Sequence, residues 1–436
     1  MKRFRTSIFP SLLLLLPLLL ASCASKRVAE KDDLSAKPDT SVAVMPLESE
    51  NPTFAVEDTT TIEAFPEPDY EGVPIVERLE LLLDDTIFAR TQVGLLVYDL
   101  DDDRVLFECN PRQCMRPASC QKIVTAVAAL HYLGVNYRYR TSLYTAGTVT
   151  DSVLEGDLYV RGGFDPLFGK DDLRAFVDSI QAWGINSVTG NLCLDLSFKD
   201  KDRLGWGWCW DDDEVPLTPL LYIGADNFAE SFLQLLRQRG IRLQGRTVET
   251  LLPDSAKKIC TRSHTIDQVL QPMLKKSDNN AAESLFFQLA AADGKPFADR
   301  KDAEKKINSL IRSLNLQPSH YQIADGSGLS LYNYLTPQLL VKILRFAYKD
   351  QTIFRHLYPA LPVAGRDGTL KKRMRATTAA DNVHAKTGTV EGISTLAGYC
   401  TAANGHTLCF AIMNQGIRHA STGRNFQDRV CVALTK

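Results

Sequence analysis

Residues 118–134 read ASCQKIVTAVAALHYLG, and the predicted fold is built around this stretch. Ala, Val, Ile and Leu occupy nearly every side of the helix that it would form, and Gly134 stands where a helix C-cap glycine belongs. A helix that is apolar nearly all round is buried among other elements. The sequence therefore predicts a central, buried helix over residues 118–133.

Ser119 and Lys122, near the start of this helix, suit nucleophilic catalysis. Residues three apart on a helix share one face, about 5–6 Å apart at Cβ, so the lysine amine can reach the serine hydroxyl. Lys122 must be neutral to accept the hydroxyl proton, and burial close to a second cation at Lys386 would lower the pKa of its amine. Taken alone, Ser119 is equally a small packing residue.

A second motif, SDN at 277–279, lies far along the chain. Ser277 and Asn279 offer a hydroxyl and an amide, which suit proton relay to a leaving amine and binding of a substrate backbone. Their spacing of two predicts a turn that projects both side chains into one cleft. By itself, Asn279 is equally a helix cap.

A third motif, KTG at 386–388, is expected on a strand. Gly388 would let a substrate backbone approach, and Lys386 and Thr387 would bind its terminal carboxylate. One at a time, Lys386 is equally an exposed strand lysine and Gly388 a bulge glycine. The three motifs in this order are far rarer than any one of them.

The ordered trio resembles the signature of penicillin-binding proteins and class A β-lactamases. Longer strings are similar to those of the D-alanyl-D-alanine carboxypeptidase/endopeptidase family, the class C low-molecular-mass penicillin-binding proteins. These strings are RPAS at 116–119, DGSGLS at 325–330, LPVAG at 361–365, DGTL at 367–370, AKTGT at 385–389 and LAGY at 396–399.

This resemblance implies an α/β (α+β) fold of the penicillin-binding and serine β-lactamase type, an antiparallel sheet flanked by helices with a smaller inserted domain. It implies that Ser119 attacks a D-alanyl peptide bond of a peptidoglycan stem peptide, that water resolves the acyl-enzyme, and that β-lactams are covalent inhibitors. The backbone N–H groups of Ser119 and Thr389 would form the oxyanion hole. No cofactor or metal is expected.

In the family an insertion separates the serine motif from the Ser-x-Asn motif. Residues 141–262 show a sequence pattern that fits such an insertion, with short strand-like runs and two helical patterns. We expect a catalytic domain of residues 74–140 and 263–436, and an inserted domain of residues 141–262. Residues 23–73 are acidic, contain prolines and lack a sustained apolar period, which predicts a flexible tether.

The first residues predict export. Three basic residues within the first five precede a leucine-rich run at 11–20, the order of a secretory signal, and the run is short for a membrane span. LASC at 20–23 resembles a lipobox, which predicts a signal peptide over 1–22 and lipidation of Cys23; a signal cleaved by the ordinary peptidase is the alternative. Ala24 favours the outer membrane by resemblance to lipoprotein sorting rules. We expect a periplasmic protein held to the membrane through a lipid anchor.

The charge balance argues against nucleic acid as a partner. Lys and Arg number 50 against 52 Asp and Glu, so the chain has no basic excess to neutralise a phosphate backbone. Hydrophobic residues make up 44% and charged residues 23%, as in an ordinary globular protein.

The chain has ten cysteines, and two of them lie near a predicted hairpin. NG at 404–405 predicts a two-residue turn between strands at 393–401 and 406–414. That register would place Cys400 opposite Cys409 with Cα atoms about 4.5 Å apart. A cross-strand disulfide and two buried thiols both fit this arrangement. The cysteines lack C-x-x-C spacing, so no zinc site is expected.

Substrate recognition departs from the family pattern. Asp212 resembles an inserted-domain acid that in relatives binds the free amine of the stem peptide's diamino acid; a solvated acid in the run 211–214 is the alternative. Leu331 stands where relatives often carry an arginine that pairs with a carboxylate, and Glu391 where some carry an amide. The sequence therefore gives no basis for recognition of that carboxylate.

Two other functions fit parts of the sequence. A β-lactamase or esterase of the same fold would lose its acyl group from Ser119 rapidly. A non-catalytic envelope binding protein would keep its role after Ser119→Ala. The intact trio argues against the non-catalytic protein.

Overall fold

The computed structural model describes residues 70–209, 211–212 and 214–436. The expected signal peptide, Cys23 and residues 23–69 of the expected tether lie outside the described residues. Across the described part, no helix combines the length and apolar character that crossing a membrane requires.

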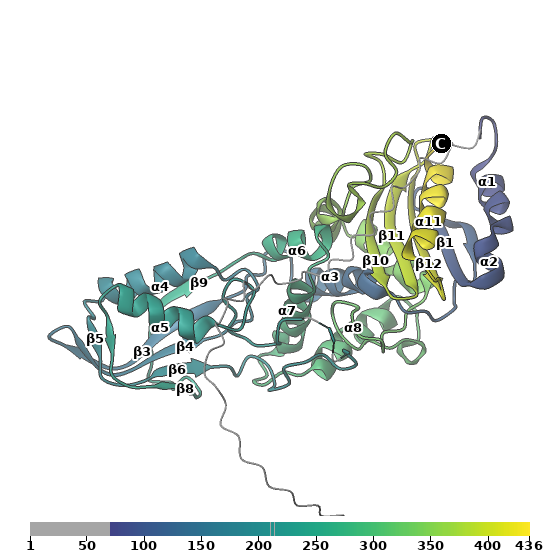
Figure 1. The fold of residues 1–436 in the computed structure, drawn as a ribbon. Helices are drawn as coiled ribbons and strands as arrows, with labels where there is room; N and C mark the ends of the chain where they lie inside the picture. The colour runs from purple at the N-terminus through teal and green to yellow at the C-terminus, as the bar shows by residue number, and fades with distance from the viewer. Residues whose placement is uncertain (1–69, 210, 213) are drawn as a thin grey trace, which may run out of the picture. The chain divides into compact units, whose positions relative to one another are not determined.

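A five-stranded antiparallel sheet joins two distant parts of the chain (Figure 1). Its strand order is β10-β11-β12-β1-β2, so strands from the C-terminal part pair with the first hairpin. The bounds are β1 Gln92–Asp99, β2 Arg104–Cys109, β10 His384–Val390, β11 Ile393–Thr401 and β12 Thr407–Gln415. Successive side chains face opposite sides of a strand, and Leu95 and Leu96 accordingly enter two different core clusters.

Helices cover both faces of this sheet. One face packs against α1 (Ile75–Leu81), α2 (Thr86–Arg90) and α11 (Ala420–Thr435), and Figure 1 shows α11 running along the strands. The other face packs against a helical cluster centred on α3 (Gln121–Tyr132). Its other helices are α6 Ile266–Lys275, α7 Asn279–Ala290, α8 Arg300–Ser313, α9 Pro337–Lys349 and α10 Gln351–Leu357. This architecture is the predicted fold class.

The predicted central helix is confirmed. Every α3 residue from Gln121 to Leu130 is buried, and Gly134 follows the helix with φ +82°. The first three residues of the predicted helix form a 3-10 turn instead, η2 (Ala118–Cys120). The other 3-10 turns are η1 Leu82–Asp84, η3 Ala291–Asp293, η4 Pro318–His320, η5 Tyr358–Ala360 and η6 Gly368–Leu370.

A second sheet is built entirely from residues 141–262. Its order is β7-β5-β4-β3-β9, with β6 pairing with β4 and β8. The bounds are β3 Thr141–Thr150, β4 Val153–Arg161, β5 Ser187–Val188, β6 Leu192–Asp195, β7 Arg242–Leu243, β8 Thr247–Glu249 and β9 Lys257–Arg262. Two helices, α4 (Lys170–Ala182) and α5 (Phe228–Gln238), share its apolar core. This segment therefore has a hydrophobic core of its own.

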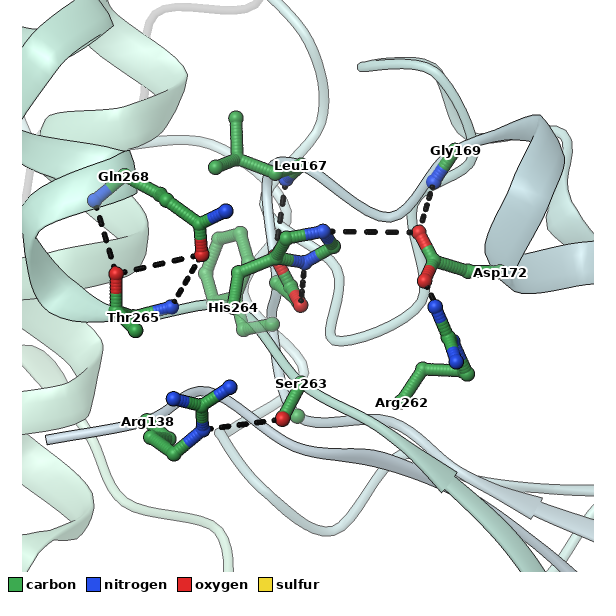
Figure 2. A network of polar contacts seen from close by, with 12 residues as sticks. Arg138, Leu167, Gly169, Asp172, Arg262, Ser263, His264, Thr265 and Gln268 are labelled. Atoms are coloured by element: carbon green, nitrogen blue, oxygen red, sulfur yellow. Dashed lines mark hydrogen bonds and ion pairs between the residues drawn. The ribbon is translucent and has the colours of Figure 1, made fainter.

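The chain returns from this sheet to α6 through a polar junction (Figure 2). Arg262 Nε donates to Asp172 Oδ1 at 2.7 Å, and His264 Nδ1 lies 2.7 Å from Asp165 Oδ2. The hydrogen bond to Asp165 raises the pKa of His264. Next, Thr265 caps α6 by accepting from Gln268 N, and the Gln268 side chain accepts from Thr265 N. The start of α6, which leads to Ser277, is thus fixed.

The predicted register of the last hairpin is wrong by one residue. Thr401 pairs with Thr407 and Cys409 faces Tyr399, because the loop has three residues rather than two. Gly405, at φ +86°, donates from its N–H to Ala402 O, the geometry of a three-residue loop with a left-handed glycine. A slip of one residue moves a side chain to the other face of the sheet.

The cross-strand disulfide is therefore not formed. Cys400 and Cys409 belong to the two clusters on opposite faces of the sheet. Each of the nine cysteines among the described residues is a free thiol. For these two positions, the alternative of two buried thiols holds.

Candidate active site

Ser119 lies on a tight turn at the N-terminal end of α3. The turn is η2, and Ala118 within it adopts φ +44°. A Cβ atom at position 328 would come within 1.8 Å of Ala118 O. Gly328 is therefore required for the DGSGLS string to lie against the turn that presents the serine.

The Lys122 ammonium is completely buried and has three acceptors. Its Nζ lies 3.0 Å from Ser119 Oγ, 2.7 Å from Asn279 Oδ1 and 2.8 Å from Ser327 O. Burial lowers the pKa of Lys122 to about 8, while the negative charges of Asp325 and Glu283 oppose this shift. The amine can therefore lose its proton near neutral pH and become the base that the serine needs.

The SDN string places both of its polar groups in the site because its central residue caps α7. The Asp278 side chain accepts from Ala281 N at 2.8 Å, so the helix begins at Asn279. Ser277, just before the cap, adopts φ +64°, and its hydroxyl accepts from Lys386 Nζ at 2.8 Å. Asn279 faces Lys122 and Ser277 faces Lys386, as the predicted turn requires.

Lys386 on β10 is the second buried amine of the site. Its Nζ also donates to Thr387 O at 2.6 Å. Burial, and then the charge of Lys122, lower the pKa of Lys386 to about 7. Because each ammonium disfavours the other, the two amines together hold about one proton near neutral pH.

Gly388 brings β10 against the serine turn. It pairs with Thr395 of β11, and a Cβ atom here would lie 2.2 Å from Thr395 Oγ1, 2.8 Å from Pro117 O and 3.0 Å from Ser119 N. Without a side chain at 388, the Thr395 hydroxyl reaches Pro117 O at 2.7 Å. The glycine thus couples the edge strand to the backbone of the nucleophile.

The remaining residues of the predicted β10 site lie along the same edge strand. The Thr387 hydroxyl bonds the Thr369 hydroxyl at 2.7 Å, and Thr389 is exposed. β10 ends the sheet order; Val363 bridges to His384 and Pro362 O accepts from Ala385 N, so the part of its outer side after Ala385 is what an extended substrate backbone could pair with.

An acid that hydrogen-bonds a catalytic group is Glu214, which the sequence interpretation did not single out. Asp212 accepts from Cys209 N at 2.6 Å, within its own turn. Glu214 Oε1, two residues on, accepts from Asn279 Nδ2, and burial raises the pKa of Glu214. Within the acidic run at 211–214, neither spacing nor composition indicates that Glu214 turns inward.

The chain matches a known protein family and two curated relatives. The model of the D-Ala-D-Ala carboxypeptidase 3 (S13) family matches residues 75–221 and 222–436. The chain is 26% identical over 419 residues to D-alanyl-D-alanine carboxypeptidase DacB of Haemophilus influenzae, covering 76% of this chain and 86% of that one. It is 25% identical over 461 residues to D-alanyl-D-alanine carboxypeptidase of Actinomadura sp., covering 83% and 84% respectively.

Solved structures share the fold. Penicillin binding protein 4 (dacB) of Haemophilus influenzae superposes with a TM-score of 0.72 at 23% identity, over 79% of this chain and 95% of that one. Bd3459, a predatory peptidoglycan endopeptidase of Bdellovibrio bacteriovorus, gives a TM-score of 0.52 at 17% identity, over 75% and 87%.

The contact at Gly388 predicts the effect of a single methyl group. Gly388→Ala would force Thr395 away from Pro117 or β10 away from the serine turn, and overpacking of this kind costs about 1–3 kcal/mol of unfolding free energy. Urea unfolding measures this loss. Thr389→Ala, one residue on and exposed, should change the free energy of unfolding by less than about 0.5 kcal/mol. Equal stability of the two variants would contradict the close approach.

Proposed function

The chain belongs to the D-Ala-D-Ala carboxypeptidase 3 (S13) family, and on that premise we propose how its residues carry out the reaction. It is a serine-type hydrolase that cleaves the D-alanyl peptide bond of peptidoglycan stem peptides. The contact that carries the proposal is the 3.0 Å hydrogen bond between Lys122 Nζ and Ser119 Oγ. A buried amine with a pKa of about 8 at this position is the base for the serine.

Acylation begins with the two lysines in different charge states. The substrate's terminal carboxylate pairs with Lys386 and holds that amine charged, which favours the neutral form of Lys122. Lys122 then takes the Ser119 proton while Oγ forms a bond to the penultimate D-alanine carbonyl carbon. The carbonyl oxygen becomes an oxyanion, and we assign its donors as the N–H groups of Ser119 and Thr389.

The leaving amine departs with a proton. The tetrahedral intermediate collapses, the carbon–nitrogen bond breaks, and Lys122 returns its proton toward the amine with the Ser277 hydroxyl as the relay. Lys386 orients that hydroxyl through its 2.8 Å contact with Ser277 Oγ. Water then attacks the ester carbon and gives its proton to neutral Lys122. The bond between the carbon and Ser119 Oγ breaks, Lys122 returns that proton to Oγ, and the shortened peptide leaves.

The same acyl-enzyme serves two leaving groups. Loss of free D-alanine is carboxypeptidase activity, and loss of a cross-linked strand is endopeptidase activity. We propose that the open side of the edge strand β10 admits both, since the acyl donor is the same in each. A β-lactam carries a carboxylate beside a reactive carbonyl and acylates Ser119 by the same first step.

Labelling with a fluorescent penicillin tests the nucleophile. The wild-type protein should acquire a covalent label that persists, and Ser119→Ala should acquire none because the attacking oxygen is absent. Mass spectrometry of muropeptides after digestion should show loss of D-alanine or of cross-links with the wild type only. Muropeptides that are identical after treatment with either protein would contradict the assigned activity. A label lost within seconds would favour the β-lactamase alternative.

The coupled amines predict a bell-shaped pH dependence for penicillin acylation. The reactive form has a neutral Lys122 and a charged Lys386, so the rate should rise as the pair loses its first proton and fall as it loses its second. Because the two pKa values are about 8 and about 7, the state with one shared proton peaks between them. Second-order labelling rates across a pH series measure this profile. A rate that keeps rising on the alkaline side would contradict a charged Lys386.

We also propose that the protein is exported and carries a lipid on Cys23. The support is the basic start, the leucine-rich run and the LASC string in the sequence. Cys23→Ser removes the thiol, so metabolic labelling with a fatty acid should be lost and the protein should leave the membrane fraction. Fatty-acid label on the Cys23→Ser protein would contradict the anchor.

A further inference from the structure

A second side chain of α7 bonds the loop whose carbonyl orients the catalytic lysine. Glu283 lies one turn after Asn279, so the two share a helix face. It is 2% exposed and belongs to none of the three catalytic motifs. A carboxyl group buried this deeply needs hydrogen-bond partners or a compensating charge.

The partners of Glu283 are backbone groups that lead directly to Lys122. Glu283 Oε1 accepts from Ser327 N at 2.8 Å and from Gly326 N at 3.1 Å. The carbonyl of Ser327 is in turn the 2.8 Å acceptor of Lys122 Nζ. Thr125, one turn after Lys122 on α3, donates to Gly326 O at 2.7 Å. Glu283 therefore anchors the segment that orients the amine.

The charge of the Glu283 carboxylate also acts on the Lys122 amine. The groups that act on the charge of Lys122 come from every element around it: Asp325 and Glu283, then Glu214 and Asp278, and the cation Lys386. Asp325 accepts four hydrogen bonds, from Gly328 N, Ser330 N, Asn333 Nδ2 and Trp208 Nε1. Glu283 has only the two backbone donors, which lie closer to Oε1, and Gly326 N is 3.3 Å from Oε2.

We propose that Glu283 is a positioning residue for the general base: it holds the Ser327 carbonyl against the Lys122 amine and, by its own charge, sets whether that amine carries a proton. The inference rests on the proposed serine mechanism and deepens it. In this role a buried residue outside the three substrate-binding motifs sets the protonation state of Lys122.

The proton balance follows from the contacts. If Lys122 becomes neutral while Asp325 and Glu283 are both ionised, two uncompensated negative charges remain in the core. Burial, and then the charge of Asp325, raise the pKa of Glu283 to about 8, close to that of Lys122. A proton on Oε2 leaves the two short bonds at Oε1 intact. Glu283 can therefore take up a proton when Lys122 has none, without moving the loop.

Glu283→Gln removes the charge and keeps an oxygen for both N–H groups. Without the carboxylate, the ammonium of Lys122 is less stable and its pKa falls. The acid limb of the penicillin acylation profile should move to lower pH by at most about one unit, the scale of one nearby charge. Well below pH 8 the wild-type Glu283 carboxyl is itself protonated, so the rates of the two proteins should converge in acid, and the maximum of the variant should be lower because its base is weaker.

Two further variants separate charge from geometry. Glu283→Asp keeps the charge but draws it back from the loop, so the maximum rate should fall while the acid limb stays in place. Glu304→Gln removes one negative charge from α8, where Glu304 pairs with Arg300, and should leave the profile unchanged. Thermal unfolding of each variant verifies that it is folded.

The outcomes distinguish the two proposals. A wild-type protein that penicillin does not label would refute the serine mechanism itself. If penicillin labels the wild type, but the acid limb of Glu283→Gln lies at the same pH as that of the wild type, the role proposed for Glu283 is overturned. If Glu283→Gln does not fold, a shifted limb in Glu283→Asp would equally overturn it, because the charge is retained there.

Discussion

The hydrogen bonds of the Lys122 ammonium are the constraint on which the catalytic unit depends. A lysine with no exposed surface loses the hydration of its charge, and only well-placed acceptors offset that cost. The acceptors come from the turn η2 before α3, from the start of α7 and from the loop at 325–328. Because each must lie within hydrogen-bond reach of one nitrogen, the position of any of these segments fixes the others. The same contacts leave the amine able to lose its proton near neutral pH.

Close backbone approach is the second constraint, and it explains why glycines stand on both sides of the serine. Gly328 lies against Ala118 O, and Gly388 lies against the backbone of Pro117 and Ser119. A side chain at either position would separate the loop or the edge strand from the nucleophile. The sheet is therefore pinned to α3 through backbone contacts rather than long side chains.

The parts of this site that sequence predicts are those with a local pattern. The apolar run after Ser119 indicates a buried helix. The three motifs identify the side chains that lie together at its N-terminal end. Other features depend on contacts that no local pattern records. Glu214 is singled out by its contact with Asn279 and not by its place in an acidic run, and Glu283 shows its role only through the loop at 325–328. The register of Cys400 and Cys409 depended on whether the turn had two residues or three, which the NG string alone does not decide.

The segment between the first two motifs supports the helix that orients the base. At the C-terminal end of α7, Gln288 Nε2 donates to Gly163 O at 2.8 Å, and the Lys199 ammonium lies 4.8 Å from the centroid of the Phe287 ring. At the N-terminal end, Asn279 donates to Glu214. Residues 141–262 thus hold both ends of α7, whose inner face carries Asn279 and Glu283. An insertion at this point in the chain can therefore influence catalysis without contributing a nucleophile or a base of its own.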